Sequence, residues 1–412
     1  MNNDFYFDDE NAENTPPDFS ENTAEGKDIE IDFSVQKTSN EASDKSGVNN
    51  SDNLINIQNS TYTAENPQNP PPFQPNYYGY QHSYQPFYGS QYENTDALQL
   101  YYEKKAVKRT SNHIGVGLLL FYAFQFVISY IIAFFMVSKS AVDFINNPAV
   151  TLELNIILSL LGFGLSGIFI LKTEGVRASS LISYGPPKKG SLLAAIMVGV
   201  GFCYTANVVV TLLQARFQNI LPFTQPELEL PNGVLGFLLS VLSVAIAPAL
   251  IEEFLFRSVI MGSLLKFGKA FAIFTSAFLF ALVHGNLIQI PFAFLVGLVI
   301  GAMVVETNSF WTGVIIHFLN NFISVCMDYL SRVADENILN VAYLFLLASL
   351  IIVGFFGFYI LSIKNKALFA FKKTGHLSST IKRFGWFSAS VSIIIYFVIV
   401  FLEIIFVQMS GA

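Results

Sequence analysis

Nine long apolar segments follow residue 112, and they restrict what this chain can fold into. They cover approximately residues 113–137, 149–171, 191–216, 234–258, 270–287, 288–305, 310–331, 338–363 and 384–408. About 20 apolar residues are enough for a helix to cross the hydrocarbon core of a bilayer. Helices satisfy their backbone polar groups internally, as a lipid environment requires. The sequence therefore predicts an all-α, polytopic transmembrane helix bundle of about nine spans, with the lipid bilayer as its surroundings.

The overall composition agrees with a membrane protein. Only 13% of the residues are charged and 52% are hydrophobic, whereas soluble domains carry about 25% charged residues. The chain has two cysteines, Cys203 and Cys326, and both lie within apolar segments. We interpret them as small core residues rather than as a disulfide or a metal-binding pair.

The first 100 residues differ from the rest of the chain. They carry a net charge of −14, are rich in Asn, Ser, Gln and Pro, and lack helical or strand periodicity. Such a segment cannot bury enough apolar area to offset its ordering entropy. We predict a disordered low-complexity cytoplasmic tail over 1–100, with no identified partner and, because it is acidic, no affinity for nucleic acid. The remaining domains are predicted at 101–190 (two transmembrane helices and a linker), 191–332 (core) and 333–412 (C-terminal transmembrane helices).

The distribution of basic residues predicts the orientation of the bundle. A basic run from Lys104 to Arg109 precedes the first apolar segment, and further Lys and Arg residues fall after segments two, four and eight. With nine spans all of these lie on one side, whereas loop 217–232 on the other side contains no Lys or Arg. Cytoplasmic loops are enriched in Lys and Arg. We expect a cytoplasmic N-terminus in an integral protein of the plasma membrane.

The fourth apolar segment contains three ionisable residues, Glu252, Glu253 and Arg257. A charge in the middle of a membrane helix costs about 2.5–3.5 kcal/mol on insertion scales, so such residues need partners and a function. Glu253 and Arg257 are at i and i+4 and can pair along one helical face. Glu252 is rotated by about 100° and points elsewhere. Pro248, one turn earlier, removes a backbone hydrogen bond and predicts a kink or a widened turn.

Two histidines lie in apolar segments that pack near these carboxylates. Segments four and five should form a hairpin turning near Phe267, with Glu252 15 residues before and His284 17 residues after it. At about 1.5 Å per residue the two side chains reach the same depth and can face each other. On segment seven, His317 and Asn321 share one face at i and i+4. We therefore predict a polar pocket built from three helices.

This set of residues suits hydrolysis of a peptide bond within the membrane. A Glu beside a His can hold and deprotonate a water molecule. His and Asn donors can stabilise the oxyanion that forms when this water attacks a carbonyl carbon. Each residue alone also has a structural explanation, because His and Asn commonly join helices in membranes. Their occurrence together favours a functional site.

Three short motifs lie on segments four, five and seven. They are Glu252-Glu253-x-x-x-Arg257, Phe280-x-x-x-His284 and His317-x-x-x-Asn321. In this order and at these separations, they resemble the motifs of the CPBP intramembrane proteases. That family includes the type II CAAX prenyl endopeptidases and bacterial bacteriocin-processing relatives. The resemblance covers about residues 190–330, and it implies that Glu253, Arg257 and Phe280 shape the site.

The resemblance also implies the roles of the remaining motif residues. Glu252 would be the base that activates water, with His284 helping to hold that water. His317 and Asn321 would stabilise the oxyanion. The implied activity is that of an intramembrane endopeptidase that cuts a membrane-associated peptide or a lipidated protein.

Cofactor use remains open at this stage. Members of the family are often called metalloproteases, but the sequence has no HExxH pair on one helix. Glu252, His284 and His317 could form a His₂Glu zinc site. A metal-free, glutamate-dependent hydrolysis is equally compatible with these residues.

A second class of function could use the same buried residues. An immunity or scaffold protein would need them only for structure, and a proton-coupled transporter could relay protons through Glu252 and His284. Transporters usually contain internal repeats with broken helices in matching positions. No such duplication is visible in the sequence, which favours the endopeptidase. The sequence leaves the substrate and the oligomeric state undefined.

Overall fold

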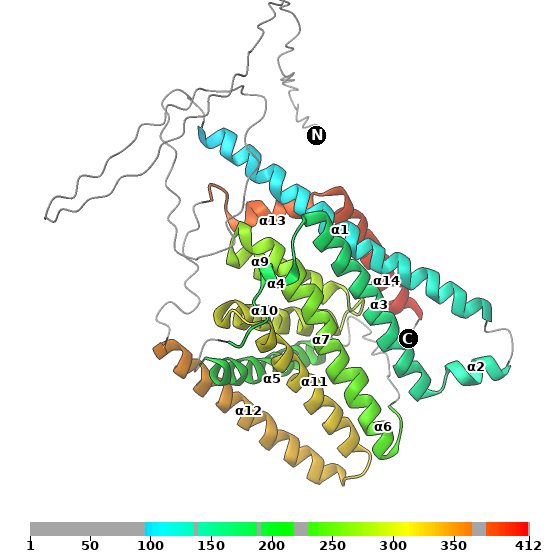
Figure 1. Ribbon diagram of the computed structural model, residues 1–412. Helices are drawn as coiled ribbons and strands as arrows, with labels where there is room; N and C mark the ends of the chain where they lie inside the picture. The colour runs from blue at the N-terminus through cyan, green and yellow to red at the C-terminus, as the bar shows by residue number, and fades with distance from the viewer. Residues whose placement is uncertain (1–94, 136–138, 188–190, 218–229, 365–375, 411–412) are drawn as a thin grey trace, which may run out of the picture. The chain divides into compact units, whose positions relative to one another are not determined.

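The computed structural model describes residues 95–135, 139–187, 191–217, 230–364 and 376–410 (Figure 1). These residues fold into helices and contain no strand, which confirms the predicted all-α class. They all lie in one compact unit, Pro72–Ala412. The predicted tail falls mainly in residues 1–94, outside the described residues. The first helix begins at Thr95 and so starts inside the segment predicted as tail.

Seven separate long helices form most of the bundle. They are α1 (Thr95–Phe135), α3 (Pro148–Glu174), α5 (Leu192–Phe217), α10 (Gln289–Thr307), α11 (Phe310–Ser331), α12 (Glu336–Lys364) and α14 (Val391–Ser410). The shorter helices are α2 (Lys139–Ile145), α4 (Ala178–Leu181), α9 (Lys269–Leu282) and α13 (Thr380–Ser388).

One composite helix runs from Gly233 to Phe267 and changes its winding several times. In order, its parts are α6 (Gly233–Ser240), the π-helix η1 (Val241–Ile246), α7 (Ala247–Glu253), the π-helix η2 (Phe254–Met261), α8 (Gly262–Leu264) and the 3₁₀ turn η3 (Leu265–Phe267). π-Helical turns are rare in proteins, and those that occur are often found at functional sites.

By length and composition, seven helices of the described residues can cross a membrane, or eight if α13 and α14, bent by 76°, form one span. The predicted number of about nine is therefore approximate. The fifth predicted segment is α9, with 14 residues and a length of about 21 Å, shorter than the hydrocarbon core of about 30 Å. Most of α9 is buried against its neighbours. The apolar pattern alone does not distinguish a short helix buried in the bundle from a helix that spans the membrane.

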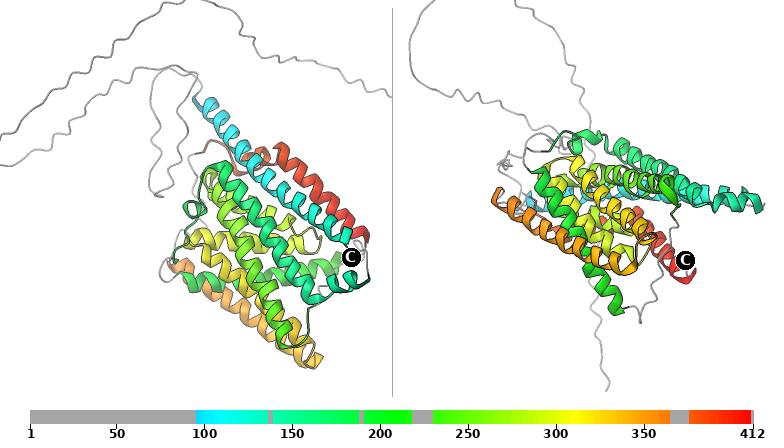
Figure 2. Two further views of the ribbon diagram at one scale, coloured as in Figure 1. Left: turned by 45° about the vertical axis from the view of Figure 1, so that its right-hand side comes forward. Right: turned by 90° about the horizontal axis from the view of Figure 1, so that it is seen from below.

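The helices pack around the composite helix. Helix α3 lies against α7 and η2, α11 against η1 and α7, and α9 against η2, while α10 packs on α9 and α5. Helix α12 covers α5, and α14 lies along α1 (Figure 2). The backbones of α5 and α12 approach closely, because a Cβ at Gly201 would lie 2.4 Å from Gly354 Cα. Small residues allow such close approach between membrane helices.

Ion pairs join three helices at the end where the basic residues gather. The carboxylate of Glu174, at the end of α3, contacts His113 Nδ1 of α1 and Lys266 Nζ of the composite helix, each at 2.7 Å. At the opposite end, Arg332 donates to Leu230 O at 2.6 Å and joins the end of α11 to the start of the composite helix. The composite helix therefore runs parallel to α3 and antiparallel to α11, and its middle lies between them.

Candidate active site

The π-helical turns lie directly before and after α7, the segment that ends in the two adjacent carboxylates. This confirms the widened turn predicted from Pro248. Proline has no N–H, so Pro248 cannot donate to Val244 O, four residues earlier. Asn321 of α11 supplies a donor instead, with its Nδ2 at 2.9 Å from Val244 O. The side chain of Asn321 is thus fixed by a backbone carbonyl beside the site.

Glu253 is fully buried and lies between two cationic or potentially cationic side chains. Its Oε2 is 3.2 Å from Arg257 Nε, which confirms the predicted i, i+4 pair. Its Oε1 is 3.0 Å from His317 Nδ1. A ring nitrogen that faces a carboxylate carries a proton, so Glu253 fixes the tautomer and the orientation of the His317 ring. Gly313 leaves room for this contact, because a Cβ there would lie 2.6 Å from Glu253 Oε2.

Phe280 links the buried cation to the two imidazoles. Its ring centroid lies 4.4 Å from Arg257 Cζ, a distance at which a cation is attracted to the ring face. The rings of His284 and His317 pack edge-on against it, at 5.0 and 6.0 Å between centroids. The terminal guanidinium nitrogens of Arg257 have no hydrogen bond within the described residues. Phe280 and Glu253 are therefore its main electrostatic partners.

His284 follows the end of α9 and is oriented by its own backbone. Its Nδ1 lies 2.9 Å from Phe280 O, and since a carbonyl only accepts, Nδ1 is the donor. In the neutral ring, Nε2 then carries the lone pair. The next residue, Gly285, has φ 58° and starts the turn toward α10. A Cβ at Gly285 would lie 2.8 Å from Glu403 Cδ, so α14 also contacts this turn.

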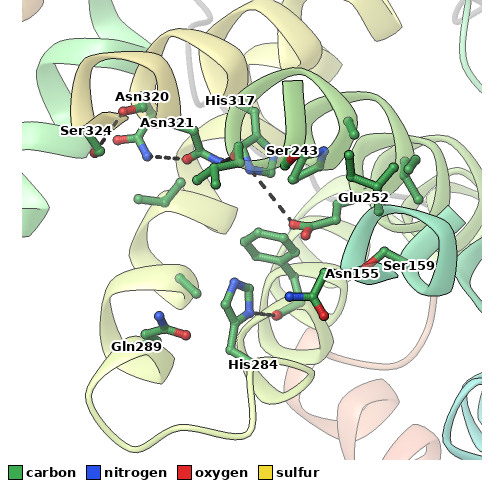
Figure 3. Close-up of a pocket in the computed structure, with 18 of the residues that line it drawn as sticks. Asn155, Ser159, Ser243, Glu252, His284, Gln289, His317, Asn320, Asn321 and Ser324 are labelled. Atoms are coloured by element: carbon green, nitrogen blue, oxygen red, sulfur yellow. Dashed lines mark hydrogen bonds and ion pairs between the residues drawn. The ribbon is translucent and has the colours of Figure 1, made fainter. Parts of the chain in front are cut away.

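The nearest histidine to Glu252 is His317 rather than His284. His317 Nε2 lies 3.9 Å from Glu252 Oε2. Within the described residues, no hydrogen bond or ion pair joins Glu252 to His284. Equal depth along the hairpin therefore did not bring these two side chains into direct contact. Figure 3 shows them on separate walls of one cavity.

The cavity has a volume of about 390 Å³ and lies between α3, η1, α7, α10 and α11. Its polar lining comprises Asn155, Ser159, Ser243, Glu252, His284, Gln289, His317, Asn320, Asn321 and Ser324 (Figure 3). Phe280 is part of its apolar lining. Of the seven residues in the motifs, five thus line the cavity, and the remaining two, Glu253 and Arg257, lie outside its lining. The volume is within the range of about 300–1,000 Å³ that is typical of ligand pockets.

Sequence reasoning missed six polar residues of this lining: Asn155, Ser159, Ser243, Gln289, Asn320 and Ser324. Asn155 and Ser159 lie at i and i+4 in the mostly apolar α3, and this spacing could have indicated a polar face. Asn320 Nδ2 donates to Asn321 Oδ1 at 3.0 Å and further fixes that amide. Nothing in the sequence pattern connects Gln289 to the three motifs.

The donor set required for a zinc site is not assembled. Glu252 and His317 approach each other, but in the part of the chain that the structure describes, no three His, Cys, Asp or Glu side chains form a group that could hold a metal ion. His284, the third ligand of the predicted His₂Glu set, belongs to no such group. The residues present therefore do not fit a three-ligand metal centre.

Comparison with known families gives one match. Residues 234–323 match the family model "Type II CAAX prenyl endopeptidase Rce1-like". The match spans all three motifs and confirms the predicted resemblance, and it supports an intramembrane endopeptidase activity in general terms. No curated protein and no solved structure matches the chain. Helix α3, which forms one wall of the cavity, lies outside the matched residues.

Proposed function

We propose that this chain, whose residues 234–323 form an Rce1-like type II CAAX prenyl endopeptidase domain, hydrolyses a peptide bond of a membrane-associated or lipidated substrate. One observation carries the proposal. Glu252 of α7, His284 after α9, and His317 and Asn321 of α11 line a single cavity inside an apolar bundle. Buried ionisable residues in membrane proteins are costly and mark functional sites.

In the proposed reaction, Glu252 acts as the general base. A water molecule in the cavity is held by the Glu252 carboxylate and by His284 Nε2, the nitrogen left free by the bond to Phe280 O. Glu252 takes one proton from this water, and the water oxygen bonds to the carbonyl carbon of the substrate. General-base catalysis of this kind contributes about 10²- to 10⁴-fold to the rate.

The developing oxyanion is stabilised from α11. Asn321 uses one amide hydrogen for Val244 O, and its second amide hydrogen is available for the oxyanion. His317 Nε2 donates as well when the ring carries both protons. Donors fixed in advance in a site of low dielectric are effective at this step. Glu252 then passes its proton to the leaving nitrogen as the C–N bond breaks, so one water is consumed and a carboxylic acid and an amine are released.

We further propose that the protein resides in the plasma membrane with its N-terminus in the cytoplasm. The bases that surround the start of α1 and the ends of α3 and of the composite helix support this orientation. The contacts of Glu174 with His113 and Lys266 keep these ends together. The active-site cavity would then be reached by substrates delivered through the bilayer or along its surface.

The proposal is tested with Glu252→Gln, which keeps the shape of the side chain and removes the base. The purified protein is reconstituted with two fluorogenic probes: a farnesylated peptide with a C-terminal CAAX sequence, and an unlipidated membrane-spanning peptide. We expect cleavage of at least one probe by the wild type and a loss of roughly 100-fold or more in Glu252→Gln.

Glu153→Gln is the matched control, because Glu153 is an exposed carboxylate on the membrane helix α3 and does not line the cavity. This variant should cleave at the rate of the wild type. Retained cleavage by Glu252→Gln, with unfolding temperatures equal among the three proteins, would contradict the role of Glu252. Proton-coupled uptake by proteoliposomes without any cleavage would instead favour a transporter.

A further inference from the structure

The polar side chains of the cavity that the motif chemistry does not use include Asn155, Ser159 and Gln289. Asn155 and Gln289 are exposed and Ser159 is half-buried. None of these side chains has a hydrogen-bond partner within the described residues. The other serines of the lining, Ser243 and Ser324, instead bond back to their own helices. The three side chains are therefore free to bind a ligand.

These side chains lie on different walls of the cavity. Asn155 and Ser159 are one turn apart on α3 and share one face, whereas Gln289 begins α10. Figure 3 shows Asn155 and Ser159 on one side of His284 and Gln289 on the other. The two walls are held by different neighbours, because α3 packs on α7, η1 and η2, and α10 packs on α9, α5 and α11. A ligand that contacts both walls would therefore lie beside the proposed catalytic residues.

A peptide at this position has a specific chemical requirement. To expose one peptide bond to water, a substrate must unwind locally, and its free N–H and C=O groups then need partners inside the bundle. A buried amide without a hydrogen bond is unfavourable in proteins. Asn and Gln side chains each offer an acceptor and two donors, and Ser offers both as well. They therefore match the backbone of an unwound segment.

We propose that Asn155, Ser159 and Gln289 form a backbone-binding subsite that holds an extended segment of the peptide substrate across the cavity. The proposal rests on the proposed peptidase function and specifies the form in which the substrate binds. Asn155 and Ser159 lie outside the residues 234–323 that match the family model. Substrate binding is thus assigned partly to α3, whereas the reaction is assigned to the matched segment.

The first experiment measures the kinetics of Asn155→Leu and Gln289→Leu on the peptide probe that the wild type cleaves. Each variant should raise KM by roughly 5- to 100-fold, because each leaves a backbone group of the substrate unpaired. The value of kcat should stay within about twofold, because neither residue takes part in proton transfer. Asn155→Ser, which retains a donor and an acceptor, should recover part of the loss.

The matched control is Asn340→Leu, since Asn340 is an exposed amide on α12 that does not line the cavity. This variant should leave both KM and kcat unchanged. Equal KM values in wild type, Asn155→Leu and Gln289→Leu would overturn the proposal. A fall in kcat at constant KM would overturn it too, since that result indicates a role in the reaction step. If Asn155→Leu does not fold, Asn155→Ala takes its place.

A second experiment identifies the contact with the substrate backbone. A series of probes carries one ester bond in place of each peptide bond next to the cleaved one, which removes a single N–H. The rise in KM caused by Asn155→Leu should disappear for one probe of the series, because that probe already lacks the N–H that donates to Asn155. A constant rise in KM across the series would show that Asn155 accepts from none of these N–H groups, and would overturn that contact.

Binding measured in the Glu252→Gln background separates this proposal from the proposed function. Affinity of the same probe for Glu252→Gln should fall when Asn155→Leu is added. Binding that depends on Asn155 without cleavage by the wild type would support the subsite and contradict the peptidase. Cleavage by the wild type with affinities that do not depend on Asn155 or Gln289 would support the peptidase and contradict the subsite.

Discussion

Replacing Arg257 by methionine would remove the cation from a pair in which both side chains are almost fully buried. Arg257 is 1% exposed and Glu253 is 0% exposed, with 3.2 Å between Nε and Oε2. Breaking a buried pair from one side leaves an uncompensated charge and costs about 3–5 kcal/mol. The lost contact with Phe280 adds about 0.5–2 kcal/mol. His317, with Nδ1 3.0 Å from Glu253 Oε1, still donates a hydrogen bond to this carboxylate in the variant, so we expect the lower half of this range.

The measurement is reversible unfolding of the detergent-solubilised protein by SDS titration. Asp328→Asn provides the control, because Asp328 and Arg332 form another i, i+4 pair, at 2.8 Å, with side chains 44% and 31% exposed. An exposed pair contributes about 0.2–1 kcal/mol. The double variant Arg257→Met/Glu253→Gln removes both buried charges and should recover most of the loss.

This prediction is wrong if Arg257→Met lowers the free energy of unfolding no more than Asp328→Asn does. It also fails if the double variant costs the sum of the two single variants, since the two side chains would then act independently. Either result would mean that water or lipid headgroups reach Arg257, and that the buried network does not position His317.

Two further predictions concern the turn after α9 and the use of metal. Gly285→Ala should lower turnover and stability more than Gly175→Ala. Both glycines have positive φ, so alanine costs about 1–2 kcal/mol of backbone conformation at either position. Only at Gly285 would the new Cβ also meet another side chain, with Glu403 Cδ at 2.8 Å. Elemental analysis of the purified protein should find no stoichiometric zinc, because no three-donor group is assembled among the described residues; one equivalent of zinc that is lost in a His284→Ala/His317→Ala variant would contradict this.

Part of the candidate site could be predicted from sequence spacing. Residues at i and i+4 share a helical face wherever the helix forms, so the contact between Glu253 and Arg257 followed from the sequence. The costly placement of charges in apolar segments indicated that Glu252, His284 and His317 would converge. All three line the same cavity.

The rotation of the helices about their axes could not be predicted in this way. Sequence distance fixes the depth of Glu252 and His284 along the hairpin, but π-helical turns change the number of residues per turn on both sides of α7. As a result, Glu252 lies nearest to His317. The contribution of α3 was also missed, because Asn155 and Ser159 come from a distant part of the sequence and belong to no motif.

The contact between Asn321 and Val244 O links the two helices through a vacancy in the hydrogen-bond ladder of one of them. Pro248 creates that vacancy, and a side chain from α11 fills it. The two positions affect the same carbonyl: a residue with an N–H at 248 would add a backbone donor near it, whereas an apolar residue at 321 would remove the side-chain donor. We therefore expect the effects of substitutions at positions 248 and 321 on stability to be non-additive.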